Sequence, residues 1–425
     1  MELTEKEIAQ WIVQLKADNA AEISVQPSGA PFDPIKEPAT WRLGIYATAF
    51  FYIPEAARQP LAQGIPALHA RFQALTGHPL TSYQNGKTGS VSKQYTQEKL
   101  EADFLAAMDG GVGTLVGYDG GTKESSPRFA MNAVLDFDPT TRPGGELQML
   151  SYLTVRLPLS FWLTRRQDFL LWWLEALSLL APEQAYLGLS LANPPILERW
   201  PFVEPAELAL AKAFYGLEID KPFFMGSSER DGMHLESGQR TPAYGVLLHG
   251  QALERLGGKA AVQRHLTALS PDFRLTPCLD GWWVEAGNEP KLYPVEAGIP
   301  PLPAALAVLT RPLRLDCLRL VSYNPNIPDD RRFTPETARR WLKRFDDDGD
   351  WPSPEVRFKA PTTPLMDTTS TSLAAHPGEP CPETGDWYAV NLGGKTVFVQ
   401  KGEPMPGPNL GPGGEVIWHL RKPGP

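Results

Sequence analysis

Cysteine is scarce in this chain of 425 residues, which has only Cys278, Cys317 and Cys381. Their wide spacing and odd number match neither a disulfide framework nor a zinc-binding motif. The seven histidines are also scattered, and none forms the paired spacing typical of a metal site. The sequence therefore predicts no metal centre and no bound cofactor, and scattered thiols are typical of a reducing compartment.

A surplus of positive charge is also lacking. The chain has 40 Lys and Arg against 49 Asp and Glu, a formal net charge of −9. Proteins that bind nucleic acid directly usually carry a basic surplus, so we expect no direct binding of DNA or RNA. An acidic protein instead suits a basic partner, because opposite charges speed encounter. Solubility alone is the alternative explanation of the charge.

Long uninterrupted hydrophobic runs are missing too. The most apolar stretch, residues 161–180, is interrupted by Arg165, Arg166, Asp168 and Glu175, whereas a membrane span needs about 20 nearly uncharged residues. The first residues, MELTEKE, have neither the basic start nor the apolar run of a secretion signal. We therefore expect a cytoplasmic protein with no membrane partner.

Proline and glycine, at 43 and 37 residues, are abundant and divide the chain into short elements. Alternating apolar residues predict strands at 41–53, 129–137, 147–157, 185–191 and 241–249, and a hairpin at 275–286 that turns at Leu279-Asp280. Helical periodicity predicts helices at 4–15, 54–75, 164–180, 204–216, 252–256, 259–269, 303–309 and 334–345. Six glycines in residues 110–121 indicate a loop or hairpin tip.

These patterns predict an α+β fold of mostly antiparallel sheets with flanking helices, plus a small C-terminal β module. We divide the chain into an N-terminal helix and connector (1–40), an α+β domain (41–345), an acidic turn with a Pro/Thr-rich linker (346–380) and the β module (381–425). The module is expected to hold three short strands, at 387–390, 396–400 and 416–420.

One motif could carry catalysis. Asp136, Asp138 and Thr140 follow an apolar strand as D-x-D-x-T, the nucleophile motif of haloacid-dehalogenase-like phosphatases. There the first carboxylate attacks phosphorus, the second serves as acid and base, and both help to hold magnesium. The residues that follow form a turn, and the order of elements does not alternate as a parallel sheet requires. A solvated strand end is therefore favoured over a magnesium-dependent phosphohydrolase.

A run of carboxylates at Asp346, Asp347, Asp348 and Asp350 follows the helix predicted at 334–345. It imitates the start of a calcium loop, but Trp351 stands where that loop needs glycine, so we do not expect calcium. Carboxylates at the negative end of a helix are mildly unfavourable, which suggests a role in engaging a basic partner. We predict that this run binds the partner, with Trp351 as an exposed aromatic anchor. A plain solvated loop is the alternative.

Several segments between about residue 41 and residue 320 resemble the type VI secretion immunity family, which was first catalogued as a domain of unknown function. They are F-F-M-G at 223–226, P-A-Y at 242–244, L-E-R-L-G-G at 253–258, D-G-W-W-V-E-A-G at 280–287 and P-L-R at 312–314. The tail resembles a module of type VI-associated immunity proteins, in C-P-E-T-G-D-W-Y at 381–388, G-E-P-M-P at 402–406 and Trp418.

The resemblance implies a protein that is not an enzyme and that binds and neutralises a cognate secreted toxin. A cytoplasmic location favours a nuclease or nucleotide-consuming toxin, and an acidic inhibitor can occupy a basic nucleic-acid cleft and so occlude the active site. An adaptor or chaperone that escorts a type VI effector is the main alternative. The phosphohydrolase of Asp136 and Asp138 is a further alternative, and a homodimer is left open.

Overall fold

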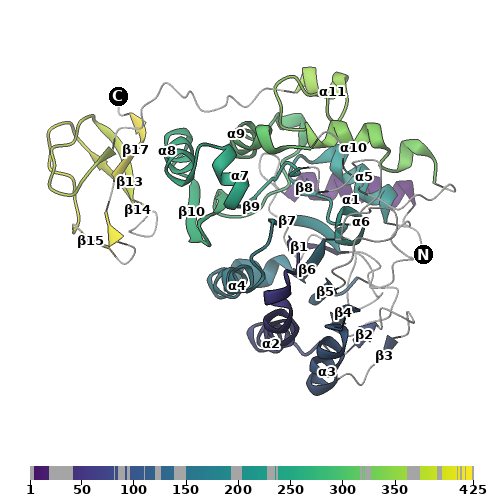
Figure 1. Ribbon diagram of the computed structural model, residues 1–425. Helices are drawn as coiled ribbons and strands as arrows, with labels where there is room; N and C mark the ends of the chain where they lie inside the picture. Colours follow the sequence, from purple (N-terminus) through teal and green to yellow (C-terminus); the bar gives the residue numbers. More distant parts are fainter. Residues whose placement is uncertain are drawn as a thin grey trace. The chain divides into compact units, whose positions relative to one another are not determined.

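The computed structural model describes most of the chain: residues 4–18, 42–80, 82–84, 91–92, 96–109, 111–119, 126–137, 150–192, 203–226, 235, 238–315, 318, 320, 327–360, 374–389, 395–408, 410–411, 414–416 and 418–423. The chain forms two compact units (Figure 1), one of residues 1–262 and 272–363 and one of residues 263–271 and 364–425. The finer domain boundaries expected at residues 40, 345 and 380 stay predictions.

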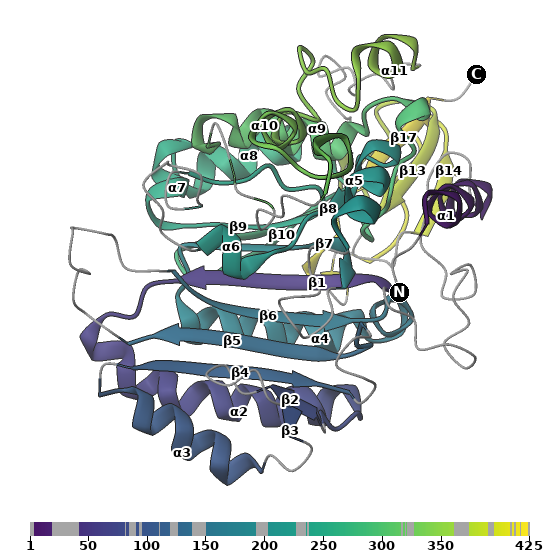
Figure 2. The same ribbon diagram turned by 90° about the vertical axis from the view of Figure 1, so that its right-hand side faces the viewer.

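The larger unit is built on one long sheet. Its described strands follow the order β10-β11-β9-β7-β1-β6-β5-β4-β2-β3, and β8 pairs with β7. Neighbours along this path are antiparallel, and β8 is parallel to β7. The strands are β1 (Arg42–Phe51), β2 (Ser82–Gln84), β3 (Val91–Ser92), β4 (Val112–Tyr118), β5 (Ala130–Asp136), β6 (Ser151–Leu157), β7 (Gln184–Ala192), β8 (Leu217–Glu218), β9 (Gly245–Leu248), β10 (Phe273–Cys278) and β11 (Gly281–Ala286). Figure 2 shows β1, β6, β5 and β4 side by side.

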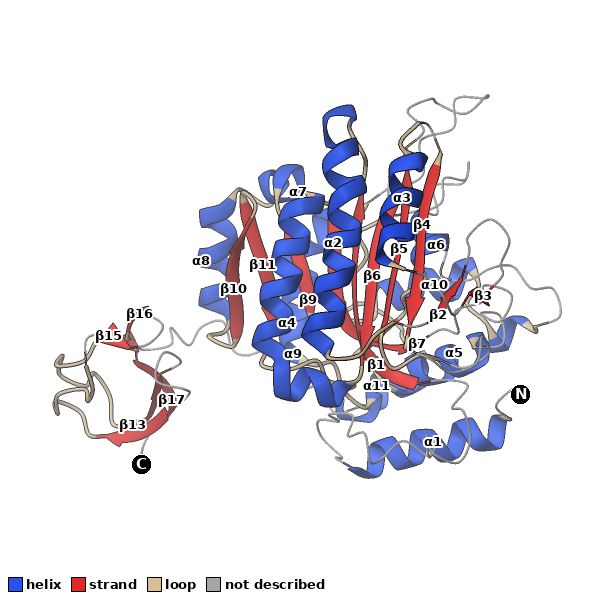
Figure 3. Ribbon diagram, turned by 90° about the horizontal axis from the view of Figure 1, so that it is seen from below, coloured by secondary structure: helices blue, strands red, loops and turns tan. Residues whose placement is uncertain are grey.

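Helices cover both faces of this sheet, which confirms the α+β prediction. In Figure 3, α2, α3 and α4 lie along one face, and α5, α6 and α10 lie behind the sheet. The described helices are α1 (Glu5–Asp18), α2 (Arg58–Thr76), α3 (Gln97–Ala107), α4 (Leu159–Leu180), α5 (Glu204–Ala213), α6 (Pro222–Gly226), α7 (Gly250–Arg255), α8 (Lys259–Leu269), α9 (Pro301–Thr310), α10 (Pro335–Leu342) and α11 (Pro354–Lys359).

The two faces of the central strands differ in chemistry, because successive side chains of a strand point to opposite faces. On the α2–α4 side the packing is apolar and aromatic. The rings of Phe72 in α2 and Trp172 in α4 lie 5.1 Å apart, and Trp173 of α4 meets Trp283 of β11 edge-on. On the α5–α6 side the central strands present hydroxyl and charged groups, including Thr48 and Arg156, which are buried.

Helix α1 forms as its sequence predicts. The N–H of Thr4 donates to the Glu7 carboxylate at 2.7 Å and the N–H of Glu7 donates to Thr4 Oγ1 at 3.3 Å, so the capping box is complete. Trp11 and Leu15 are buried, and Lys16 reaches Glu296 at 2.5 Å. The apolar stripe therefore packs on the larger unit, as expected.

The hairpin of β10 and β11 also matches its prediction. Residues Cys278 and Gly281 pair across a two-residue turn, in which Leu279 has a positive φ of 52°. Strand β10 ends the path of described strands, so one of its sides is an edge of the sheet. Pro277, which has no amide hydrogen, lies on this edge strand, the position in a sheet that tolerates proline.

The prediction of a loop or hairpin tip at residues 110–121 is wrong, because residues 112–118 form β4 between β5 and β2. Its glycines serve packing. A Cβ at Gly113 would lie 3.0 Å from the ring of Phe104, and one at Gly117 would lie 3.1 Å from the ring of Tyr83. These contacts are tighter than nearly all real Cβ contacts, so a larger residue at either position would require the ring above it to shift.

Three helical segments also differ from expectation. Helix α4 begins at Leu159, well before the predicted start at Thr164, and Arg165 has non-helical angles (φ −128°, ψ 24°) where the helix kinks. Helix α3 has no counterpart in the prediction. The segment expected to be a linker contains the short helix α11, which Ser353 caps by accepting a hydrogen bond from the N–H of Val356.

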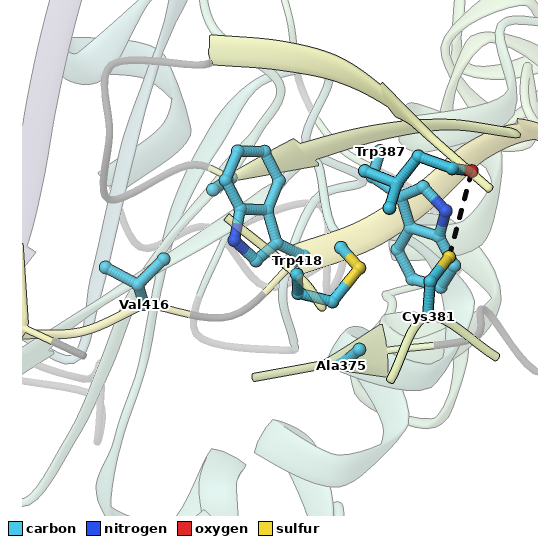
Figure 4. Close-up of a cluster of buried hydrophobic side chains, with 8 residues drawn as sticks. Ala375, Cys381, Trp387, Val416 and Trp418 are labelled. Atoms are coloured by element: carbon cyan, nitrogen blue, oxygen red, sulfur yellow. Dashed lines mark hydrogen bonds between the residues drawn. The ribbon is translucent and has the colours of Figure 1, made fainter. Parts of the chain in front are cut away.

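The smaller unit contains the C-terminal module as a four-stranded sheet in the order β12-β17-β13-β14, with a separate pair β15-β16. The strands are β12 (Ala374–Ala375), β13 (Gly385–Ala389), β14 (Lys395–Val399), β15 (Leu410–Gly411), β16 (Gly414–Glu415) and β17 (Trp418–Pro423). Trp387, Trp418 and Cys381 gather in its core (Figure 4). Both indole N–H groups donate to backbone carbonyls, those of Glu383 and Pro406. The predicted β module is confirmed.

Candidate partner-binding surface

The acidic run lies in a tight turn directly after α10. Thr334 caps this helix, because its Oγ1 accepts from the N–H of Thr337 at 3.2 Å while its own N–H donates to Thr337 Oγ1 at 2.6 Å. After Leu342 the chain folds back on itself. A Cβ at Gly349 would lie 2.5 Å from the carbonyl oxygen of Lys343, so only glycine fits there.

Two of the four carboxylates are used inside the chain. Asp346 is 3% exposed and accepts two hydrogen bonds from Arg314, each of 2.7 Å. Asp350 lies 2.9 Å from Nε of Arg340, which also donates to the Asp350 carbonyl. A bidentate arginine pair fixes geometry as well as charge, so these two residues secure the turn.

The two remaining carboxylates, those of Asp347 and Asp348, are exposed. Asp348 lies 3.6 Å from Arg311, an exposed pair that solvent screens strongly. Of the predicted contact residues, Asp347 and Asp348 are thus the two whose carboxylates point outward. Their role in partner binding stays a prediction.

The expectation that Trp351 is exposed is wrong. Its side chain is 1% exposed, its Nε1–H donates to the carbonyl of Ala211 at 3.1 Å, and its ring stacks on Phe333 at 6.2 Å. Ala211 lies 140 residues earlier in the chain, so the polar residues around Trp351 gave no sign of this contact. This tryptophan holds α5 and the turn after α10 together.

The D-x-D-x-T motif has the wrong surroundings for a phosphatase. Asp136 is 4% exposed and ends β5, and its N–H donates to Oγ of Ser151 at 3.0 Å. Strand β5 pairs antiparallel with both β4 and β6, whereas the motif belongs to parallel sheets. Asp138 lies outside the described residues. Within the described part of the chain, no three His, Cys, Asp or Glu side chains are grouped so that they could hold a metal ion.

A buried charge network fills the polar side of the sheet, and no sequence motif predicted it. Arg156 of β6 pairs with Asp220 at 2.8 Å. The hydroxyls of Thr48 and Thr154 donate to the same carboxylate at 2.9 and 3.3 Å. Lys221 and Glu207 form a second pair at 2.8 Å. The only sequence signal was the recurrence of polar residues at alternate positions of otherwise apolar strands.

Glu218 connects this network to the segment that follows α10. Its carboxylate lies 3.4 Å from Arg344 and 3.5 Å from Arg240, and it accepts a hydrogen bond from the N–H of Ala243 at 2.5 Å. Burial raises the pKa of Glu218 to about 7, although Arg344 opposes that rise. Burial likewise lowers the pKa of Arg344 to about 10. The network therefore fixes α10 to the sheet, at the cost of desolvating each charge.

A family model of type VI immunity for VRR-NUC, called TsiV, matches residues 65–345. The chain belongs to this family. Membership confirms the expectation of a type VI immunity protein, implies a role without catalysis, and makes the cognate partner a VRR-NUC nuclease toxin. The match covers helices α3 to α10 and every described strand of the long sheet except β1. The acidic turn from Asp346 onward and the C-terminal module lie beyond it.

A solved structure, described as Pseudomonas aeruginosa T6SS protein PA0821, has the same fold. It superposes with a TM-score of 0.62 and 18% sequence identity over 81% of this chain and 91% of that chain. No curated protein matches the chain. Among the described helices, none has the length and apolar character needed to cross a membrane.

Proposed function

We propose that this protein neutralises its cognate VRR-NUC nuclease by binding it and covering the surface with which the nuclease holds nucleic acid. The observation that carries the proposal is the family match over residues 65–345. The proposed encounter takes place in the cytoplasm, where a nuclease toxin meets its substrate, and this chain performs no reaction of its own.

Charge supports this mode of inhibition. A nuclease must present basic side chains to the phosphates of its substrate, and this chain has a formal net charge of −9. An acidic protein can therefore compete with nucleic acid for the same groups. Long-range attraction also raises the rate of encounter, so that the toxin is captured before it reaches its substrate.

A preorganised scaffold supports it as well. The long sheet is packed on both faces, and its polar side is fixed by the buried pairs of Arg156 with Asp220 and Lys221 with Glu207. A surface that is already ordered loses little conformational entropy when it binds. Rigid elements are thus suited to a tight complex that must form with little rearrangement.

Titration of nuclease activity tests the proposal. The full chain is added in steps to a fixed concentration of the VRR-NUC nuclease, and cleavage of linear duplex DNA is followed. We expect inhibition that is complete at a fixed molar ratio and that weakens as DNA or salt is raised. Unchanged cleavage with the chain in excess, or inhibition by catalytic traces of it, would show that it does not act by covering the nuclease.

A further inference from the structure

Helix α3 presents one face that nothing in the described part of the larger unit covers. Leu100 and Phe104 are buried toward the sheet, whereas Glu98, Glu101 and Leu105 are exposed. These three stand at positions i, i+3 and i+7, which places them on one side of a helix. Leu105 is 41% exposed at the centre of this side, and the exposed Asp109 follows the helix end. We call Glu98, Glu101, Leu105 and Asp109 the α3 face.

Within the described part of the chain, no basic side chain forms an ion pair with the carboxylates of the α3 face. Among the described residues no ion pair includes Glu98, Glu101 or Asp109, and Lys99, on an adjacent side of the helix, pairs with Asp103 at 3.0 Å. The acidic turn differs, since arginines lie near three of its four carboxylates. The negative charge of the α3 face is therefore available to attract a basic partner.

The helix is held firmly although its outer face is free. Nε2 of Gln97 donates to the carbonyl of Pro66 at 2.9 Å and to the carboxylate of Glu101 at 3.1 Å, while its Oε1 lies 3.3 Å from the buried His69 ring. Oγ1 of Thr96 caps the helix by accepting from the N–H of Lys99. Glu101 is thus positioned before any partner arrives, which lowers the entropic cost of binding.

We propose that the α3 face docks into the basic groove with which the VRR-NUC nuclease binds nucleic acid. The carboxylates take the place of substrate phosphates, and Leu105 supplies the apolar contact at the centre of the interface. Charge complementarity selects this occupant, because a nuclease groove is the basic surface that the family's partner must possess. The inference rests on the proposed function, and the α3 segment lies inside the matched residues 65–345.

Charge reversal on the α3 face tests the inference, with a matched reversal elsewhere as the control. The test variant is Glu101→Lys/Asp109→Lys. The control is Glu183→Lys/Glu254→Lys, which changes the net charge equally at two exposed acids beside β7 and in α7. Glu98 is left in place because a carboxylate in the first turn supports the helix. Binding of a catalytically inactive VRR-NUC nuclease is measured by surface plasmon resonance at several salt concentrations.

We expect the association rate of the test variant with the nuclease to be about tenfold lower at low salt and to change little with salt concentration. The association rate of the control should stay within about twofold of that of the unmodified chain. The substitution Leu105→Asn should instead raise the dissociation rate by about tenfold, because it removes an apolar contact. A tenfold change corresponds to a loss of about 1.4 kcal/mol in binding free energy. Circular dichroism confirms folding. If the double lysine variant does not fold, Glu101→Gln/Asp109→Asn removes the same charges with side chains of nearly equal shape.

The outcomes separate this inference from the function on which it rests. If the unmodified chain binds the nuclease and the α3 variants bind it equally well with the same salt dependence, the docking surface lies elsewhere and the proposed function stands. If the unmodified chain does not bind the nuclease at all, both proposals fail.

Discussion

Replacement of Trp351 by alanine distinguishes a structural tryptophan from a partner-binding one. The side chain is 1% exposed, stacks on Phe333 and donates a hydrogen bond to Ala211. Truncating a buried tryptophan costs about 3–5 kcal/mol, and the lost hydrogen bond accounts for about 1 kcal/mol of this. We therefore expect Trp351→Ala to lower the free energy of unfolding by about 3–5 kcal/mol, more than a hundredfold in the folding equilibrium.

Urea unfolding of the full chain, followed by far-ultraviolet circular dichroism, measures this loss. Phe358→Ala is the matched control, because Phe358 is an aromatic residue only seven positions away that is 80% exposed on α11. Its loss should change the free energy of unfolding by no more than about 0.5 kcal/mol. The nuclease affinity of folded Trp351→Ala is measured below the onset of unfolding, where we expect it to be unchanged.

The opposite pattern would refute the packing argument. A Trp351→Ala variant as stable as the unmodified chain, but with a nuclease affinity reduced by tenfold or more, would mean that the side chain turns outward in solution. Trp351 would then be the exposed aromatic anchor that the sequence suggested.

Three further outcomes follow from the buried charges and the helix cap. The pKa of Glu218 is about 7 in the folded chain and near 4.5 in the unfolded chain, so between these pH values the folded chain binds the proton more tightly. The free energy of unfolding should therefore fall by about 3 kcal/mol as the pH rises from about 4.5 to about 7. Thermal unfolding across that pH range should show this fall in the unmodified chain and not in Glu218→Gln. Asp220→Ala leaves Arg156 buried without its partner and should cost about 3–5 kcal/mol in urea unfolding, whereas Lys99→Ala, which breaks an exposed pair, should cost less than about 1 kcal/mol. Thr334→Ala removes the α10 cap and should lower the free energy of unfolding by about 1 kcal/mol, measured in the same way.

Elements specified by local chemistry were predictable from the sequence. The capping box of Thr4 and Glu7 marked the start of α1, and the turn at Leu279-Asp280 marked the β10–β11 hairpin. Helix α8 was predicted with the bounds that the structure shows, Lys259–Leu269. In each case the deciding contacts lie within a few residues of one another, so a local pattern contains them.

Elements decided by distant contacts were missed. The glycines of β4 indicated a loop, but they are small because the rings of Phe104 and Tyr83 press on the strand. Trp351 was placed at the surface because acidic residues precede it, yet Ala211 and Phe333 bury it. No short window of sequence contains Trp351 together with Ala211, or Gly117 together with Tyr83.

The candidate site also combines features that the sequence shows with features that only the fold shows. The carboxylates of the acidic run are plain in the sequence, but their arginine partners, Arg314 and Arg340, are known only from the fold. Conversely, the acids of α3 were not singled out because that helix was not predicted. The acidic composition led us to expect a partner with a positively charged surface, and only the tertiary structure shows which carboxylates of this chain are exposed.

Pro277 has a consequence for how two copies of this protein could meet. A second sheet that approached β10 edge to edge would need an amide hydrogen from every other residue of the strand, and at this position there is none to give. A sheet that continued from one molecule into the next through β10 would therefore lack one interstrand hydrogen bond at Pro277. Pro277 therefore disfavours edge-to-edge pairing through β10, and we expect any homodimer to form through side chains on another surface.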